Sequence, residues 1–561
     1  MLALAVFLAI RIDVRRIGLL RFLRDRGRRL AHRPWLACLL LVGVCLGLNL
    51  CLTMIRYPLP WVHDEFSYLL AARTFAEGRL TNPRHELWEH FETFHVLSDP
   101  GYMSKYPPAS SLFMAAGQWL TGHPIVGAWL ALALASAAMY WMLRAWTSPH
   151  WALLGGALVA ASAPLIRAWG QTYWGGSVAL LGGALVFGGL RRICDCRSTP
   201  CWRDASAVGC GAVLLANSRP MEGFLACLPV AVCLLVWLAG SPAGLRWQRT
   251  IRVALPLLAI GGSGLVAMGV YNQQVTGDPL LMPYRLHDRT YSQSSLVVWR
   301  ELPEPPQYNH PRMEQFYRQW GRDRQQHLRT ASGYLQNLHR KLNLLWNFLP
   351  IGMGWSLIPL FFLWRYPWWR LALVTVAGVL LVHAQLATSW MYPHYLAPVL
   401  ALFLAVNIEC LRHLAVWHRT RRLGRTLTRV VLVLAILKLV PMFIDWHKPL
   451  RPHPRQWVHQ QLQADPAPQH LVIVSYGDDY RIVDDWVYNH PDIDASPVVW
   501  ARHMGEAKNE QLVEYFPDRK IWRWHLDGDD QMTLQESALP SNRLAGPQPV
   551  FSSCPAIQPA W

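Results

Sequence analysis

The chain has 561 residues, of which 52% are hydrophobic and only 16% are charged. Soluble domains usually contain about 25% charged residues, so this composition excludes a protein made of soluble domains alone. The formal net charge is +18. The basic residues cluster between apolar runs, which is typical of the cytoplasmic loops of membrane proteins and argues against nucleic-acid binding.

The N-terminal segment, residues 1–33, begins with ten apolar residues, which are too few to cross a bilayer. An arginine-rich stretch follows and ends at Arg33. A signal peptide carries its charges before its apolar core, and here the order is reversed. We therefore expect an amphipathic segment that lies in the cytoplasm or on the membrane surface.

Apolar runs of spanning length, about 20 residues each, predict eleven transmembrane helices. The run at 205–218 is short, and the stretch 107–120 fits either a re-entrant or an additional helix. The predicted spans cover residues 35–55, 124–143, 151–168, 174–190, 205–218, 222–239, 252–271, 344–364, 369–388, 393–411 and 426–445.

The orientation of these spans follows from the charges between them. With the N-terminus inside, the inner connections are short, basic and almost free of acids. The alternation agrees with the positive-inside rule through all eleven predicted spans. It places loops 56–106 and 272–343 outside the cytoplasm. The predicted fold is therefore mainly α, with a multi-pass helical domain over residues 34–446.

The C-terminal part, residues 447–561, is soluble in character and lies outside by the same count. Residues 471–476, 497–501 and 520–525 read as buried strands, and 508–516 reads as a helix. Alternating strands and helices predict a small α/β domain. The tail after Asp530 is rich in Pro, Ser and Gln, so we expect it to be loosely ordered.

Signatures of cofactor or metal binding are missing from the sequence. It contains no G-x-G-x-x-G, Walker or H-E-x-x-H motif. The three cysteines of the basic loop 194–201 match no usual zinc spacing, and we expect reduced cytoplasmic thiols. The four aspartates between residues 478 and 485 are interpreted as a solvated loop rather than a cation site. We predict no cofactor and no metal site, and a divalent-metal requirement stays open.

The first outer loop begins with residues 61–68, which contain the adjacent acids Asp64 and Glu65. An apolar stripe that follows predicts a helix ending near Gly78, so both acids lie in its first turn. Acids at this position commonly cap a helix and complement its dipole. The alternative is a carboxylate at the water–lipid boundary that acts as a general base on a hydroxyl.

The same loop ends with the sequence Ser104-Lys105-Tyr106-Pro107-Pro108. The prolines fix a helix start and hold Lys105 where an apolar segment enters the membrane. One interpretation is a lysine whose ammonium group reaches the interface. The other is a cation that binds a lipid phosphate.

These two pieces together resemble the GT-C superfamily of membrane glycosyltransferases. Its members include lipid A aminoarabinose transferases and protein O-mannosyltransferases, which show Asp-Glu after the first span; the aminoarabinose enzymes also show Lys-Pro-Pro before the second. In this chain Tyr106 is inserted before the prolines. The resemblance covers about residues 35–410. Further motifs that resemble a bacterial branch are 170–175, 218–223, 271–272, 276–279 and 283–284.

The resemblance implies a polyprenyl-phosphate-linked sugar as donor and transfer on the periplasmic face of a bacterial inner membrane. Asp64 would be the general base, helped by Glu65, and direct displacement would invert the anomeric centre. Lys105 and Arg219 would bind the phosphate. The remaining candidates for substrate binding are Tyr106, Glu222, Gln171, Tyr173, His394 and Tyr395.

Alternative interpretations stay open for Arg219 and Glu222, which also fit a local ion pair across one helical turn. His394 and Tyr395 equally fit interfacial aromatics that anchor a helix. For the whole chain, the alternatives are a transporter or flippase, a polymerase or ligase for lipid-linked glycans, and a non-catalytic sensor. The acceptor would be a glycan, lipid or protein, and membrane lipids would be partners.

Overall fold

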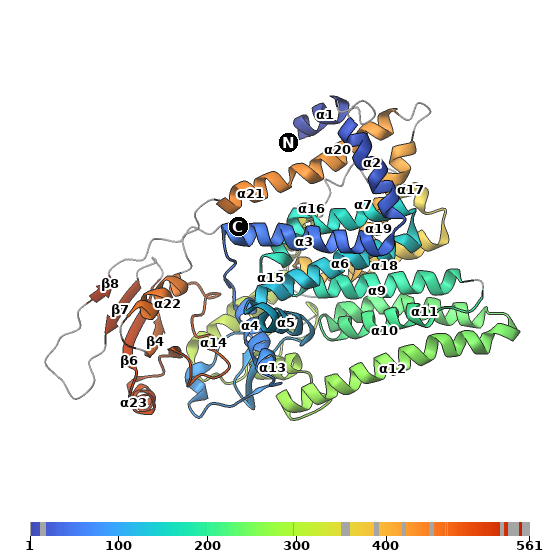
Figure 1. Ribbon diagram of the computed structural model, residues 1–561. Coiled ribbons are helices and arrows are strands. Elements are labelled where there is room, and N and C mark those ends of the chain that lie inside the picture. The colour runs from blue at the N-terminus through green and yellow to red at the C-terminus, as the bar shows by residue number, and fades with distance from the viewer. Residues whose placement is uncertain are drawn as a thin grey trace.

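The computed structural model shows a helical bundle with smaller sheets at one end (Figure 1). It describes residues 2–11, 18–196, 198–295, 297–348, 360–385, 392–417, 422–447, 454–465, 467, 469–527, 532–536 and 549–551.

Seven helical segments in the described part of the chain are long and apolar enough to cross a membrane, and a bent pair makes an eighth. The seven are α3 (Pro34–Ile55), α6 (Pro124–Trp146), α9 (Gly176–Asp195), α11 (Pro220–Ala239), α12 (Ala243–Thr276), α19 (Ala397–Val416) and the segment Leu423–His447, which joins α20 (Arg422–Leu437) to α21 (Leu439–His447). The chain is thus a multi-pass membrane protein.

The other predicted spans are shorter helices or fall partly outside the described residues. The predicted span 205–218 is the 15-residue helix α10 (Trp202–Ala216), and 369–388 overlaps α18 (Pro367–Gln385). The predicted span 344–364 includes residues 349–359, which lie outside the described part. The count of eleven therefore stays a prediction.

The bent pair consists of α7 (Pro149–Ala160) followed by α8 (Ala163–Leu165) and η2 (Ile166–Gly170), with a bend of 40°. This break is anchored on α3. A Cβ on Gly170 would lie 2.1 Å from Asn49 Oδ1, so only glycine permits this approach.

Lipid-facing surface is visible on the outer helices. On α12, Leu258, Leu265 and Val266 are 64% to 72% exposed. Apolar surface of this extent on a soluble protein would be an aggregation site, whereas hydrocarbon solvates it in a bilayer. The inner helices are closely packed instead. A Cβ on Gly183 of α9 would lie 2.0 Å from Pro398 O of α19.

The two loops predicted to lie outside, residues 56–106 and 272–343, form small elements at one end of the bundle, near the C-terminal sheet (Figure 1). The first outer loop contains α4 (His63–Ala76), β1 (Asn82–Pro83), η1 (Trp88–Phe91), β2 (Val96–Leu97) and β3 (Gly101–Ser104), and leads into α5 (Ala109–Thr121). The second contains α13 (Pro283–Tyr291), α14 (Pro311–Phe316), η3 (Tyr317–Asp323), α15 (Arg324–Leu328) and α16 (Ala331–Phe348). Elsewhere lie α1 (Leu2–Arg11), α2 (Gly18–Ala31), α17 (Leu360–Leu363) and η4 (Pro393–Tyr395).

The C-terminal α/β architecture is as predicted. Three parallel strands, β4 (His470–Tyr476), β5 (Val498–Arg502) and β6 (Lys520–Leu526), are accompanied by α22 (Pro454–Ala464) and α23 (Glu506–Tyr515). The loose order expected of the tail after Asp530 stays a prediction, because only residues 532–536 and 549–551 of it belong to the described part. The tail's β7 (Met532–Glu536) and β8 (Pro549–Phe551) extend the sheet in the order β5-β4-β6-β7-β8, with antiparallel pairing that satisfies the edge of β6.

The prediction of a solvated acidic loop at 478–485 is wrong for Asp485. Its side chain is fully buried and forms an ion pair of 2.6 Å with Arg502, which is equally buried. Thr93 of the first outer loop also donates to Asp485, at 3.0 Å. The sequence does not reveal this partner, because Arg502 lies 17 residues further along the chain, at the end of β5. The C-terminal sheet is therefore joined to the first outer loop by a buried polar contact.

Impermeant thiol labelling should confirm the orientation. On a background without the native cysteines, Arg84→Cys and Asp518→Cys should react from outside, and Ser198→Cys only after permeabilisation, because the positive-inside rule sets these sides. All three positions are exposed. Labelling of position 518 only after permeabilisation would contradict the predicted topology.

Candidate active site

Glu65 caps the N-terminus of α4, where the first outer loop leaves the bundle. Its carboxylate accepts hydrogen bonds from the backbone N–H groups of Trp61 (2.8 Å), Val62 (3.3 Å) and Tyr173 (3.0 Å). The residue is only 3% exposed, and burial raises the pKa of Glu65 although these bonds oppose the shift. The carboxylate is thus occupied by backbone, which suits positioning of the neighbouring Asp64.

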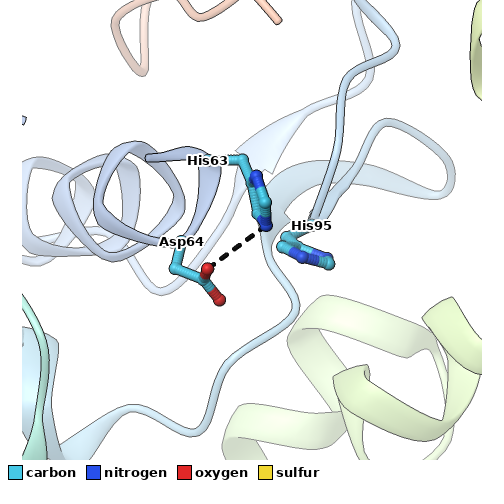
Figure 2. A group of neighbouring side chains, drawn as sticks. All are labelled: His63, Asp64 and His95. Atoms are coloured by element: carbon cyan, nitrogen blue, oxygen red, sulfur yellow. Dashed lines mark ion pairs between the residues drawn. The ribbon is translucent and has the colours of Figure 1, made fainter. Parts of the chain in front are cut away.

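Asp64 does not cap the helix, although it precedes Glu65 directly. Its Oδ1 accepts a hydrogen bond from the Tyr106 hydroxyl, and its Oδ2 lies 3.2 Å from His63 Nε2 (Figure 2). The Asp64 side chain is 30% exposed. Of the two adjacent acids, Asp64 is therefore the accessible one.

The Tyr106 ring is held by stacking. It lies parallel to Tyr68 of α4, with ring centroids 4.4 Å apart and an angle of 12°. Ser104 Oγ accepts the N–H of Tyr106 at 3.1 Å and pairs with Ser67 at 2.7 Å. The residue expected to bind substrate thus contacts the carboxylate of Asp64 through its hydroxyl.

The Lys105 ammonium group lies in a buried, aromatic environment. The residue is 7% exposed, and Nζ is 5.3 Å from the Tyr284 ring centroid and 5.4 Å from that of Tyr106. The ammonium group forms no hydrogen bond or ion pair within the described part of the chain. Burial lowers the pKa of Lys105 to about 8, although the negative charges of Asp288 and Asp64 oppose the shift.

A small cavity opens beside Lys105, between the start of α5 and the second outer loop. Its lining is mostly apolar and includes Lys105. Besides Lys105, the lining residues are Pro107, Pro108, Ala216, Asn217, Met268, Tyr271, Asn272, Met282, Pro283 and Tyr284.

Arg219 directly precedes α11 and points toward the same group of tyrosines. Its Cζ lies 5.0 Å from the Tyr395 ring centroid, and Tyr68, Glu222 and Tyr106 are its further electrostatic neighbours. No hydrogen bond or ion pair of its guanidinium is formed with the residues that the structure describes. The expected local ion pair with Glu222 is therefore absent among them.

Tyr284 of α13 connects the surroundings of the two cations. Its ring lies beside the Lys105 ammonium, and Arg219, Asp288 and Asp64 are within its electrostatic range. Burial raises the pKa of Asp288 to about 6, although Lys105 opposes the shift. The structure therefore gathers Asp64, Lys105 and Arg219 around shared tyrosines, although they come from different connections of the bundle.

Gln171 and Tyr173 make their contacts elsewhere. The Gln171 amide donates to Asn49 O and Oδ1, both at 3.0 Å, and accepts from Thr53 at 3.1 Å, so it ties the broken helix to α3. The Tyr173 hydroxyl donates to Pro58 O at 2.9 Å. These hydrogen bonds hold Gln171 and Tyr173 against neighbouring segments of the bundle. A contact of their side chains with sugar hydroxyls stays a prediction.

His394 lies in η4, just before α19. Its ring is 5.0 Å from Trp174 and is stacked on Tyr392 at 5.5 Å. Burial lowers the pKa of His394 well below its usual value, and the charge of Arg219 adds to this shift. The neighbouring Tyr395 faces the Arg219 guanidinium. His394 and Tyr395 therefore contribute aromatic rings to the surroundings of Arg219.

Sequence reasoning missed the histidines around Asp64. His63 and His95 have ring centroids 4.4 Å apart, and His287 lies 5.8 Å beyond His95. Burial lowers the pKa of His95 well below its usual value, and the Lys105 charge adds to this shift. His63 could have been identified as a candidate site residue, because it directly precedes Asp64 in the sequence. The sequence gives no such indication for His95, because only the small sheet of the loop brings it close to α4.

Comparison with solved structures identifies the fold. ArnT from Cupriavidus metallidurans, solved in the apo state and bound to undecaprenyl phosphate, matches with a TM-score of 0.52 and 12% identity, over 87% of this chain and 92% of ArnT. AglB, an oligosaccharyltransferase from Archaeoglobus fulgidus solved with an inhibitory peptide and a dolichol-phosphate, has a TM-score of 0.45 and 11% identity, over 87% and 69%. No family model and no curated protein matches. The ArnT match confirms the predicted GT-C fold.

Proposed function

We propose that this chain, which has the fold of a GT-C glycosyltransferase, transfers a sugar from a polyprenyl-phosphate-linked donor to an acceptor hydroxyl. The reaction takes place at the outer end of the bundle, on the periplasmic side of a bacterial inner membrane. The acceptor is a glycan, lipid or protein. The solved complex of ArnT with undecaprenyl phosphate supports a lipid of this class.

The observation that carries the proposal is the buried ammonium group of Lys105 together with the half-buried guanidinium of Arg219, neither of which forms an ion pair in the described structure. Lys105 and Arg219 share the tyrosine surroundings but form no ion pair there. A charge out of water is costly unless it is paired, so such a site favours an anionic ligand. A phosphate fits, since the arginine fork holds two oxygens and the lysine adds a point charge.

The chemistry follows from the placement of Asp64. The acceptor oxygen attacks the anomeric carbon, and its proton passes to the Asp64 carboxylate. The bond between that carbon and the phosphate oxygen breaks, and the polyprenyl phosphate leaves with the electron pair. Lys105 and Arg219 stabilise the negative charge that develops on this oxygen. Tyr106 positions the Asp64 carboxylate by donating a hydrogen bond to it. Glu65 positions Asp64 by capping the first turn of α4.

Donor binding is tested with undecaprenyl phosphate and the purified protein in detergent. Arg219→Gln should weaken binding by at least about tenfold, because it removes one charge-assisted contact. Arg84→Gln is the matched control, since Arg84 is an exposed arginine of the first outer loop that pairs with Asp99. Equal binding by the wild type and Arg219→Gln would contradict the assignment of the phosphate site.

Lys105 should make donor capture sensitive to alkaline pH. Its pKa is lowered to about 8, so the ammonium group is charged below this value and is lost as the pH rises through it. We expect kcat/KM for the donor to fall about tenfold between pH 7 and pH 9. Lys105→Arg should remove this fall, because arginine stays charged.

The control for this pH profile is Lys105→Met, which should have low kcat/KM at every pH. The ionisable groups in electrostatic range of the ammonium are Asp288, Asp64, His95 and His287. An unchanged alkaline fall in Lys105→Arg would assign the transition to another group and contradict the prediction.

A further inference from the structure

A group of three ligating side chains lies directly beside the proposed base. His63 and Asp64 come from the first turn of α4, and His95 follows η1 in the same loop (Figure 2). Each offers one atom, and these atoms lie within 4.8 Å of one another. The two histidines have no part in the transfer step proposed above.

The hydrogen bonding of His63 requires a positive charge between two of these groups. His63 Nδ1 lies 3.2 Å from the backbone oxygen of Val483, which can only accept, so Nδ1 carries a proton. In a neutral ring, Nε2 then has a lone pair, and it faces Asp64 Oδ2 at 3.2 Å. Two acceptors at this distance need a positive charge between them, either a proton or a metal ion.

His95 decides between these two charges. It is 8% exposed, its Nδ1 is buried without a partner, and its ring forms no hydrogen bond within the described part of the chain. A proton can join His63 to Asp64, but it leaves the imidazole of His95 unused. The backbone of His95 also has a φ of 62°, in the left-handed region. Such a conformation persists where the surrounding structure enforces it, often at a functional site.

We propose that His63, Asp64 and His95 bind one divalent metal ion of the zinc class. Two imidazole nitrogens and one carboxylate form the ligand set of catalytic zinc sites, which keep a fourth position open. Magnesium and calcium prefer sites made only of oxygen. The outer contacts also fit, because a ligating histidine usually donates its other N–H to a carbonyl, as His63 does to Val483.

The role that we infer for the ion depends on the glycosyl transfer proposed above. At its open position the ion binds the acceptor hydroxyl and lowers the pKa of that hydroxyl. Proton transfer to Asp64 Oδ1, the oxygen that Tyr106 also contacts, then becomes easier. The ion would therefore serve acceptor activation and leave donor binding at Lys105 and Arg219 unchanged.

Metal binding is measured on the untagged protein after chelation and dialysis, with Zn²⁺ for affinity and Co²⁺ for its visible absorption. The chain has 22 histidines, so variants are compared rather than absolute contents. The wild type should bind one equivalent that His63→Gln and His95→Gln each weaken at least tenfold. His503→Gln is the control, because His503 lies in the C-terminal domain near Glu506, at 3.4 Å.

Equal zinc affinity of the wild type, His63→Gln and His95→Gln, with matching thermal unfolding, would overturn the site and leave a proton between His63 and Asp64. A second experiment distinguishes failure of the metal-site inference from failure of the proposed glycosyltransferase function. Undecaprenyl phosphate should bind equally with and without zinc, whereas transfer should fall at least tenfold in the metal-free protein and recover with Zn²⁺. Full transfer by metal-free protein would overturn the role of the ion but not the glycosyltransferase.

Discussion

Asp64→Asn should reduce sugar transfer by at least about 100-fold, while protein level and membrane insertion stay unchanged. The substitution keeps the shape and an oxygen that can still accept from Tyr106, but it removes the group that takes the proton. The cap of α4 is provided by Glu65, so the fold should not suffer. Glycolipid analysis of a deletion strain that carries each variant, and transfer by the purified protein, measure the effect.

Two further variants complete this test. Asp99→Asn is the matched control, because Asp99 is an exposed acid of the same loop that pairs with Arg84. Glu65→Gln should be milder and should lower thermal stability, since its carboxylate holds three backbone N–H groups. If Asp64→Asn stays active and Glu65→Gln is inactive, the two roles are reversed. If both stay active, the glycosyltransferase proposal fails.

Arg502→Met should destabilise the C-terminal domain by about 3–5 kcal/mol, because it leaves the buried carboxylate of Asp485 without its partner. Arg502 also donates to the backbone oxygen of Glu92, at 2.8 and 3.2 Å, so the first outer loop loses a contact. Unfolding of the full-length protein, followed by tryptophan fluorescence, measures the loss. The sheet core contains Trp486, Trp500, Trp522 and Trp524.

The matched control is Arg523→Met, which removes an exposed ion pair with Glu506 and should cost at most about 1 kcal/mol. The double variant Asp485→Asn/Arg502→Met should recover part of the loss, since no unpaired charge remains. Burial alone would raise the pKa of Asp485, but Arg502 holds it below its usual value. The stabilisation is therefore present at neutral pH and is lost as the pH falls through this lowered pKa. Equal losses from Arg502→Met and Arg523→Met would contradict the argument.

The sequence by itself determined the class of protein and the order of its elements. Apolar runs of spanning length reveal membrane helices, because each helix must satisfy its own backbone hydrogen bonds in hydrocarbon. Strand and helix patterns located β4, β5, β6 and α23 within a few residues, since these signals are local. The candidate residues Asp64, Lys105 and Arg219 were also found in the sequence, from short motifs at the ends of predicted spans.

Only the tertiary structure decided what each of these residues contacts. Asp64 and Glu65 are adjacent, yet Glu65 is enclosed by backbone from Tyr173 while Asp64 stays accessible. His95 reaches Asp64 through the sheet of the first outer loop, and Asp485, in the connection after β4, pairs with Arg502 at the end of β5. The roles of such residues depend on burial and on partners far away in the chain, and a local pattern contains neither.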